Sequence, residues 1–175
     1  MNSKTKIDKG DPLLLDRQVC FPLYAASNLL TRIYRPVLEP LGLTYSQYLV
    51  MLVLWEQSPA SVGDLGERLH LDTGTLTPLL KRMELGGFVS RRRDPKDERR
   101  VLIEPTPHGH DLREAAVTVP ATLSRQLGLG EAEVDELRSA VKAFVRVLMG
   151  SKYPSTRSDA TDLRSVKLKS ALTKS

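Results

Sequence analysis

Apolar side chains recur at steps of three and four over several long stretches of the chain, which is the pattern of amphipathic helices. The first stretch, at about 13–38, places its apolar residues on a single stripe and is followed by a proline and a glycine. A capping box formed by Thr44 and Gln47 begins a second helix that runs to about residue 57. This helix is rich in Leu, Val and Met, and we expect it to be buried.

Two shorter helical patterns follow and are joined by a tight turn. The first covers 61–70 with Ser61 as its cap, and the turn is expected at 71–74. The second carries leucines and a methionine inward and ends at Gly86 and Gly87. Two short helices with such a turn between them predict a helix-turn-helix.

The chain then becomes extended. Segments 88–93 and 100–106 flank a charged tip at 94–99 and predict a β-hairpin. Pro107 opens a further helix, and a last helix begins near Glu131. Helices followed by a basic hairpin and then by long helices are the order that a winged helix-turn-helix requires.

Charge is distributed unevenly. The 175 residues contain 26 Lys and Arg against 21 Asp and Glu, a formal net charge of +5. Residues 151–175 account for most of the excess, whereas 13–150 is neutral overall. Within that neutral body, 81–100 holds eight bases and four acids. Such segregation indicates a surface that binds a polyanion.

The basic segment coincides with the parts of a winged helix-turn-helix that touch DNA, namely the second helix in the major groove and the hairpin along the backbone or in the minor groove. Arg99, at the expected hairpin tip, is the candidate for the minor groove, and Asp97 is placed to hold its guanidinium. A solvated charged hairpin would explain the basic run alone, but not its position after a helix-turn-helix. The major-groove candidates are Thr73, Thr75, Thr77, Lys81 and Arg82.

The single cysteine, Cys20, excludes a disulfide framework or a cysteine-rich zinc site within one chain. It lies near the start of the first predicted helix, where backbone N–H groups favour a thiolate. Tyr24, Ser27 and Tyr34 lie within about 40° of it on the same helical face. The simpler alternative is that the cysteine is a small buried apolar residue and the tyrosines are ordinary core residues.

Distance limits how this face can work. Tyr34 follows Cys20 by 14 residues, which is about 21 Å along a straight helix. Tyr34 therefore cannot touch the cysteine of its own chain. A cysteine site that uses Tyr34 requires an antiparallel copy of the helix from a second subunit.

Four segments together resemble the organic hydroperoxide resistance regulators, a peroxide-sensing branch of the MarR family of dimeric winged-helix repressors. They are LLLDRQVCFPLYAASNLL, YRPVLEPLGLTYSQYLVMLVLWE, LGERLHLDTGTLTPLLKRME and RRDPKDERRVLIEPTPHG. The hairpin pattern DERRVLIEPT is shared with ligand-binding relatives. The combination of QVCFPLY with TYSQYLVMLVLWE and LDTGTLTPLLKRM is what is similar to the peroxide-sensing branch.

The resemblance implies that Cys20 is the peroxidatic cysteine of a homodimer. Tyr34 and Tyr45 of the partner subunit would hydrogen-bond it, with Tyr24 nearby. The resolving cysteine of some relatives is missing. A sulfenic acid on Cys20 would therefore react with a low-molecular-weight thiol, cyclise onto a backbone nitrogen or be over-oxidised.

The resemblance also implies that 73–82, with Gly74 among its residues, reads the major groove of an inverted repeat, while Asp97 braces Arg99 in the minor groove. Thr73 stands where the family often has Ser, and it keeps the hydroxyl. The fold class expected is mainly α with a small β-hairpin wing, a winged helix-turn-helix domain plus a helical dimerisation region made by N- and C-terminal helices. The expected parts are a disordered arm at 1–12, one domain at 13–150 with dimerisation helices at 13–42 and 107–150 around the DNA-binding part at 43–106, and a flexible basic tail at 151–175.

The function predicted is a DNA-binding repressor that senses organic hydroperoxides and then releases its operator. One alternative is a MarR-type repressor released by a small aromatic ligand. A thiol peroxidase is a weaker one, because the sequence shows neither a peroxidase-like arrangement of Arg and Thr nor a resolving thiol.

No cofactor is expected, and neither is a metal, because the three histidines are interpreted as solvent-exposed. The longest apolar run, 49–55, is far below the roughly 20 residues that span a bilayer, and no targeting signal is recognised. We therefore expect a cytoplasmic protein that binds no membrane.

Overall fold

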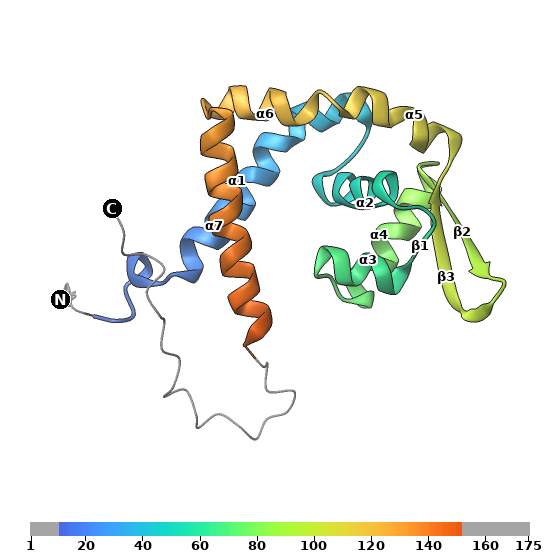
Figure 1. Cartoon of the computed structure of the whole chain (residues 1–175), viewed down its shortest axis with the longest axis horizontal. Helices are drawn as coiled ribbons and strands as arrows, with labels where there is room; N and C mark the ends of the chain where they lie inside the picture. The colour runs from blue at the N-terminus through green and yellow to red at the C-terminus, as the bar shows by residue number, and fades with distance from the viewer. Residues whose placement is uncertain (1–10, 152–175) are drawn as a thin grey trace, which may run out of the picture. The chain divides into compact units, whose positions relative to one another are not determined.

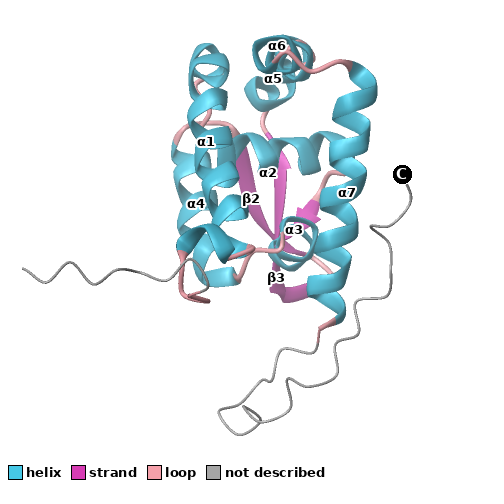
Figure 2. Ribbon diagram, turned by 90° about the vertical axis from the view of Figure 1, so that its left-hand side faces the viewer, coloured by secondary structure: helices cyan, strands magenta, loops and turns pink. Residues whose placement is uncertain are grey.

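The structure is a computed structural model that describes residues 11–151. It is mostly helical with one small antiparallel sheet (Figure 2). Its elements in chain order are η1 (Leu15–Arg17), α1 (Cys20–Leu38), η2 (Glu39–Leu41), α2 (Tyr45–Glu56), β1 (Ala60–Ser61), α3 (Val62–Leu69), α4 (Thr73–Leu85), β2 (Val89–Asp94), β3 (Asp97–Pro105), α5 (Pro107–Ala116), α6 (Val119–Leu127) and α7 (Glu131–Gly150).

The chain divides into two compact units, one ending at Gly128 and one beginning at Leu129. The first unit contains every element up to α6, and the second contains α7. Apart from residues 11, 12 and 151, the expected arm at 1–12 and tail at 151–175 lie outside the described residues. The domain boundaries drawn from the sequence stay predictions.

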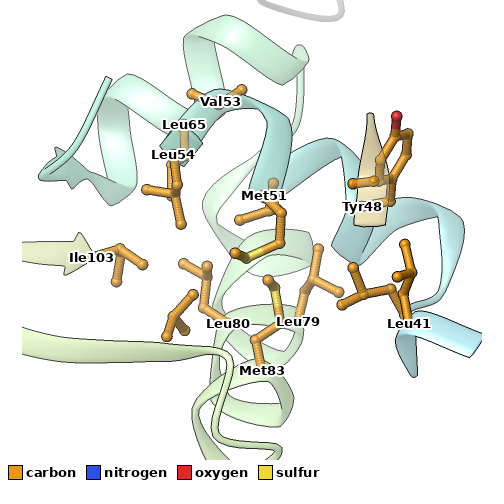
Figure 3. Close-up of a cluster of buried hydrophobic side chains, with 14 of the residues drawn as sticks. Leu41, Tyr48, Met51, Val53, Leu54, Leu65, Leu79, Leu80, Met83 and Ile103 are labelled. Carbon is orange, nitrogen blue, oxygen red and sulfur yellow. The ribbon is translucent and has the colours of Figure 1, made fainter. Parts of the chain in front are cut away.

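Helix α2 forms the centre of the first unit. The predicted capping box is confirmed: Thr44 Oγ1 accepts a hydrogen bond from the Gln47 backbone N–H, and Gln47 Oε1 accepts one from the Thr44 backbone N–H. The helix is apolar on nearly every side, and a helix of that kind is stable only when other elements surround it. Figure 3 shows Met51 of α2, Leu80 of α4 and Ile103 of β3 in one buried cluster.

The helix-turn-helix consists of α3 and α4. Ser61 and Asp64 form a second capping box at the start of α3. A Cβ on Gly66 would lie 2.9 Å from the Leu71 carbonyl oxygen, so glycine lets the turn pack directly on α3. The turn was predicted at 71–74, and its predicted end is wrong. The side chain of Asp72 caps α4, and the helix begins at Thr73.

The predicted hairpin is confirmed, with two corrections. Strands β2 and β3 are joined by a short turn at Pro95 and Lys96 (Figure 1), and Arg99 lies within β3 rather than at the tip. The sheet also contains β1, a two-residue strand that pairs with β3, giving the order β1-β3-β2. Two residues carry too little alternation for the sequence pattern to show a strand.

The first helix begins later than expected. A 3-10 turn precedes it, and α1 begins at Cys20. Pro22 therefore lies in the first turn of α1, where its missing N–H costs no helical hydrogen bond, rather than within an established helix. Cys20 becomes the first residue of the helix.

The helices after the hairpin match the prediction with one addition. Thr106 caps α5, which has a proline at its start, and α7 begins at Glu131. The sequence did not predict α6 as a separate helix. Helix α6 also has a proline in its first turn, and Gly128 caps its end. Among residues 11–151 no single helix is long and apolar enough to cross a membrane, although the bent pair 20–41 and 45–56 reaches that length and hydropathy when taken together.

The core makes a stability prediction. Leu65 of α3 is fully buried, whereas Leu85 at the end of α4 is 79% exposed. Leu65→Ala should lower the free energy of unfolding by about 2–5 kcal/mol, because it removes apolar contacts and leaves a cavity. Urea titration followed by circular dichroism measures this, with Leu85→Ala as the matched control; equal losses in the two variants would show that α3 does not pack as described.

Candidate DNA-binding surface and cysteine site

The start of α4 is held by Asp72. Its Oδ1 accepts from the Thr75 backbone N–H at 2.8 Å, and its Oδ2 accepts from the Thr75 hydroxyl at 2.9 Å. Both hydrogen bonds lower the pKa of the Asp72 carboxyl, and the one from the Thr75 backbone N–H has the larger effect. The sequence interpretation placed Asp72 in a turn and missed this role; an Asp directly before a helical pattern is the signal that could have found it.

Helix α4 has a sharply divided surface. Leu76, Leu79, Leu80 and Met83 are buried. The side of α4 that remains open to solvent carries all the residues expected in the major groove: Thr73, Gly74, Thr75, Thr77, Lys81 and Arg82. The structure thus groups the six predicted residues on the exposed part of one helix.

Ion pairs take up part of the positive charge around this helix. Arg91 pairs with Glu84 of α4 at 3.4 Å, and Arg92 pairs with Glu104 across the hairpin at 3.3 Å. Arg100 lies 3.4 Å from Asp64, the capping residue of α3.

Five cations of 81–100 make no ion pair with a carboxylate of residues 11–151. They are Lys81 and Arg82 on α4, and Arg93, Lys96 and Arg99 on the hairpin; Arg93 donates instead to the Glu98 carbonyl oxygen at 2.8 Å. The ion pairs thus tie the hairpin to α3 and α4, while the unpaired cations leave the surface positive.

In the structure of the chain without DNA, Asp97 contacts the backbone of Arg99 and not, as was predicted from the sequence, its guanidinium. Asp97 Oδ1 accepts a hydrogen bond from the Arg99 backbone N–H at 3.1 Å. Among the described residues Asp97 makes no ion pair with the guanidinium of Arg99. Asp97 therefore holds the main chain of β3, and the exposed Arg99 side chain is unpaired.

Cys20 is exposed as the first residue of α1. Tyr24, one turn further, is 68% exposed. Tyr34 belongs to the same helix, about 21 Å along it, so the structure does not bring the two predicted partners together within one chain. It leaves Cys20 open to a second molecule.

The structure does bring Tyr34 and Tyr45 together. Their ring centroids are 4.5 Å apart, and the buried Tyr48 lies 6.0 Å from Tyr34. Trp55 continues the group, 6.4 Å from Tyr48. We call Tyr34, Tyr45, Tyr48 and Trp55 the aromatic cluster.

The phenols of this cluster have raised pKa values. Burial raises the pKa of Tyr34 to about 12, with Tyr45 and Tyr48 adding to the rise. Burial also raises the pKa values of Tyr45 and Tyr48. At neutral pH all three hydroxyls carry a proton and can donate a hydrogen bond.

Comparison with known proteins identifies the family of the chain. Residues 43–101 match the model of the MarR family. The chain is 45% identical, over 81% of its length and 94% of the relative's, to the organic hydroperoxide resistance transcriptional regulator of Bacillus subtilis (strain 168). The chain belongs to the MarR family.

Solved MarR-family structures agree. Reduced AbfR bound to DNA has a TM-score of 0.67 and 36% identity, with 77% of this chain and 92% of that one covered; AbfR comes from Staphylococcus epidermidis. A mutant MarR from E. coli in complex with operator DNA has a TM-score of 0.63 and 26% identity, with 70% and 90% covered. The chain is therefore a MarR-family transcriptional regulator with a winged-helix fold, and the proteins it resembles are regulators rather than enzymes.

Two residues of the aromatic cluster were not predicted from the sequence. The sequence pattern predicts Tyr48 and Trp55 only as parts of a buried helix. The signal lay in their spacing, since Tyr45, Tyr48 and Trp55 are three and seven residues apart and share one side of α2. What the spacing did not indicate is that this side faces Tyr34 of α1.

The raised pKa of Tyr34 predicts a pH dependence. An unfolded tyrosine loses its proton near its ordinary pKa of 10.0, whereas folded Tyr34 keeps it to about pH 12. The folded chain therefore binds more protons in that window, and the free energy of unfolding falls as pH rises through it. As pH rises above 10, the free energy of unfolding of Tyr34→Phe should fall less than that of the wild type. Below pH 10 the difference in free energy between the two proteins should not change with pH. Denaturant titration at each pH measures both. Parallel curves throughout would contradict the buried environment of Tyr34.

Proposed function

We propose that a homodimer of this chain in its reduced state represses transcription by binding an inverted repeat, and that an organic hydroperoxide releases it by oxidising Cys20. The observation that carries the proposal is the placement of the exposed Cys20 at the start of α1 and of Tyr34, which packs on Tyr45 of α2, about 21 Å further along the same helix. The similarity to an organic hydroperoxide resistance regulator supports it. AbfR supports redox control as a property of relatives, because it has been solved in reduced, overoxidised and disulfide forms.

A two-fold dimer would complete the site. An antiparallel second α1 would bring Cys20 of one chain to Tyr34 and Tyr45 of the other. Helix α1 carries exposed apolar residues near the face of Cys20 and Tyr34 that such a contact would bury, among them Leu23 and Leu30. The neutral phenols would then donate hydrogen bonds to the sulfur and to a bound peroxide oxygen.

The chemistry is a two-electron oxidation of sulfur. The Cys20 thiolate attacks the terminal peroxide oxygen, the S–O bond forms as the O–O bond breaks, and the alkoxide leaves and takes up a proton to become an alcohol. The sulfenic acid then condenses with a low-molecular-weight thiol, releasing water and forming a mixed disulfide. Either product breaks the contacts to the tyrosines, which would change the spacing of the two recognition helices on DNA.

DNA recognition is assigned to the open side of α4 and to the hairpin. Thr73, Gly74, Thr75, Thr77, Lys81 and Arg82 would contact bases and phosphates in the major groove, and Arg99 would enter the minor groove with Asp97 holding its strand. Unpaired cations are the groups free to replace the counterions of phosphates. This is the main support for the assignment.

A second candidate is release by a small aromatic ligand. A groove of the first unit is lined by Tyr48, Leu52, Trp55 and Glu56 of α2, by Arg113 of α5 and by Pro120 of α6. Glu56 already pairs with Arg68, so the aromatic walls and the Arg113 cation suit an aromatic acid. Such release would require neither peroxide nor Cys20.

Cys20→Ser tests the sensing step. A duplex selected from a random pool by the reduced wild type serves as the DNA probe. The variant should bind this duplex as the wild type does but stay bound in cumene hydroperoxide, since it cannot form a sulfenic acid. Intact mass and fluorescence anisotropy on the same samples give the oxidation and the DNA binding. Release of the variant at the wild-type rate would refute the proposal, and release of both by an aromatic acid such as salicylate would favour the second candidate.

Arg99→Ala tests the wing. It should weaken binding of the selected duplex and lower the slope of log K against log salt by about one, because one cation–phosphate or minor-groove contact is lost. Arg92→Ala is the matched control, as its guanidinium already pairs with Glu104. Equal changes in both variants would argue against a special role for Arg99.

A further inference from the structure

A hydrogen bond links the aromatic cluster to helix α5, which packs beside α2. Trp55 Nε1–H donates to the Gly109 carbonyl oxygen at 2.9 Å. Gly109 is in the first turn of α5, 54 residues further along the chain. The indole thus joins the helix that carries the tyrosines to the helix that follows the wing.

The first turn of α5 is in turn fixed to the base of the wing. Thr106 Oγ1 accepts from the Gly109 backbone N–H at 3.0 Å and donates to the Gly87 carbonyl oxygen at 2.6 Å. The Thr106 backbone N–H donates to the Phe88 carbonyl oxygen at 3.1 Å. Gly87 and Phe88 form the junction between the recognition helix α4 and strand β2.

Gly109 packs directly against the backbone of Phe88. A Cβ on the buried Gly109 would lie 2.1 Å from the Phe88 carbonyl oxygen, a separation that no side chain can occupy. The backbones of α5 and of the wing base therefore touch directly. A displacement of Gly109 must displace Phe88, because closely packed atoms transmit strain.

We propose that Trp55 is a positioning residue that couples the tyrosine pair to the wing. The path runs from Tyr34 and Tyr45 through Tyr48 to Trp55, and then through Gly109 to the junction at Phe88. The inference rests on the proposed function, since it takes oxidation of the partner's Cys20 as the event that moves the tyrosines. It adds the contact through which that event reaches the DNA-binding surface.

The substitution Trp55→Phe isolates the hydrogen bond. Phenylalanine keeps an aromatic ring next to Tyr48 and removes the donor to Gly109. The reduced variant should still bind the selected duplex, and cumene hydroperoxide should oxidise Cys20 at the wild-type rate. The ratio of the oxidised to the reduced Kd should shrink by about tenfold, the equivalent of one lost hydrogen bond. Val53→Ala, at a buried position of the same helix, controls for loss of stability and should keep the wild-type ratio.

Wild-type protein gives a second readout. Trp55 is the only tryptophan of the chain, so the tryptophan emission reports on the surroundings of this one indole. Peroxide should change the emission at the rate of DNA release and increase amide hydrogen exchange in 106–110, and neither change should occur in Cys20→Ser.

The outcomes separate the two proposals. The coupling role of Trp55 is wrong if Trp55→Phe is oxidised at Cys20 and keeps the wild-type ratio of oxidised to reduced Kd. It is also wrong if emission and hydrogen exchange of the oxidised wild type stay constant while DNA is released. In both cases the sensing role of Cys20 stands. If the wild type is oxidised at Cys20 without releasing DNA, both proposals are wrong.

Discussion

The burial of α2 is the constraint on which the rest of the first unit depends. Its side chains pack against α1, α3, α4, α5 and β3. A helix that is apolar on nearly every side must be covered by other elements. The helix-turn-helix with its hairpin and the tyrosine pair are therefore built on the same helix, and each constrains the position of the other.

This arrangement explains how charge and polarity are divided. The recognition helix uses its apolar side for the shared core and leaves its hydroxyls and cations in solvent. Ion pairs from the hairpin to Glu84 and Asp64 hold the wing against the helix-turn-helix without neutralising Lys81 or Arg99. Exposed pairs of this kind contribute little stability, so we assign them to geometry rather than to folding energy.

The aromatic cluster brings phenols and an indole together along α2. Burial raises the pKa values of the tyrosines, and their rings pack against one another. In the proposed dimer, Cys20 of a second chain would accept hydrogen bonds from their hydroxyls. The hydrogen bond from Trp55 to Gly109 gives the same cluster a connection to the wing, and a regulator of DNA binding requires a connection of this sort.

Local interactions were determined by the sequence itself. The caps at Thr44, Ser61 and Thr106 and the division of α4 into apolar and open sides depend on residues a few positions apart, and the hairpin depends on two segments that follow each other directly in the chain. The separation of Cys20 from Tyr34 is also local, since helical rise alone sets it. Only the tertiary structure decided that Tyr34 meets Tyr45, that Trp55 reaches Gly109, that Arg100 pairs with Asp64 and that β1 joins the sheet. These contacts join residues 11 to 54 positions apart, and they depend on how helices pack, which periodicity along one segment does not encode.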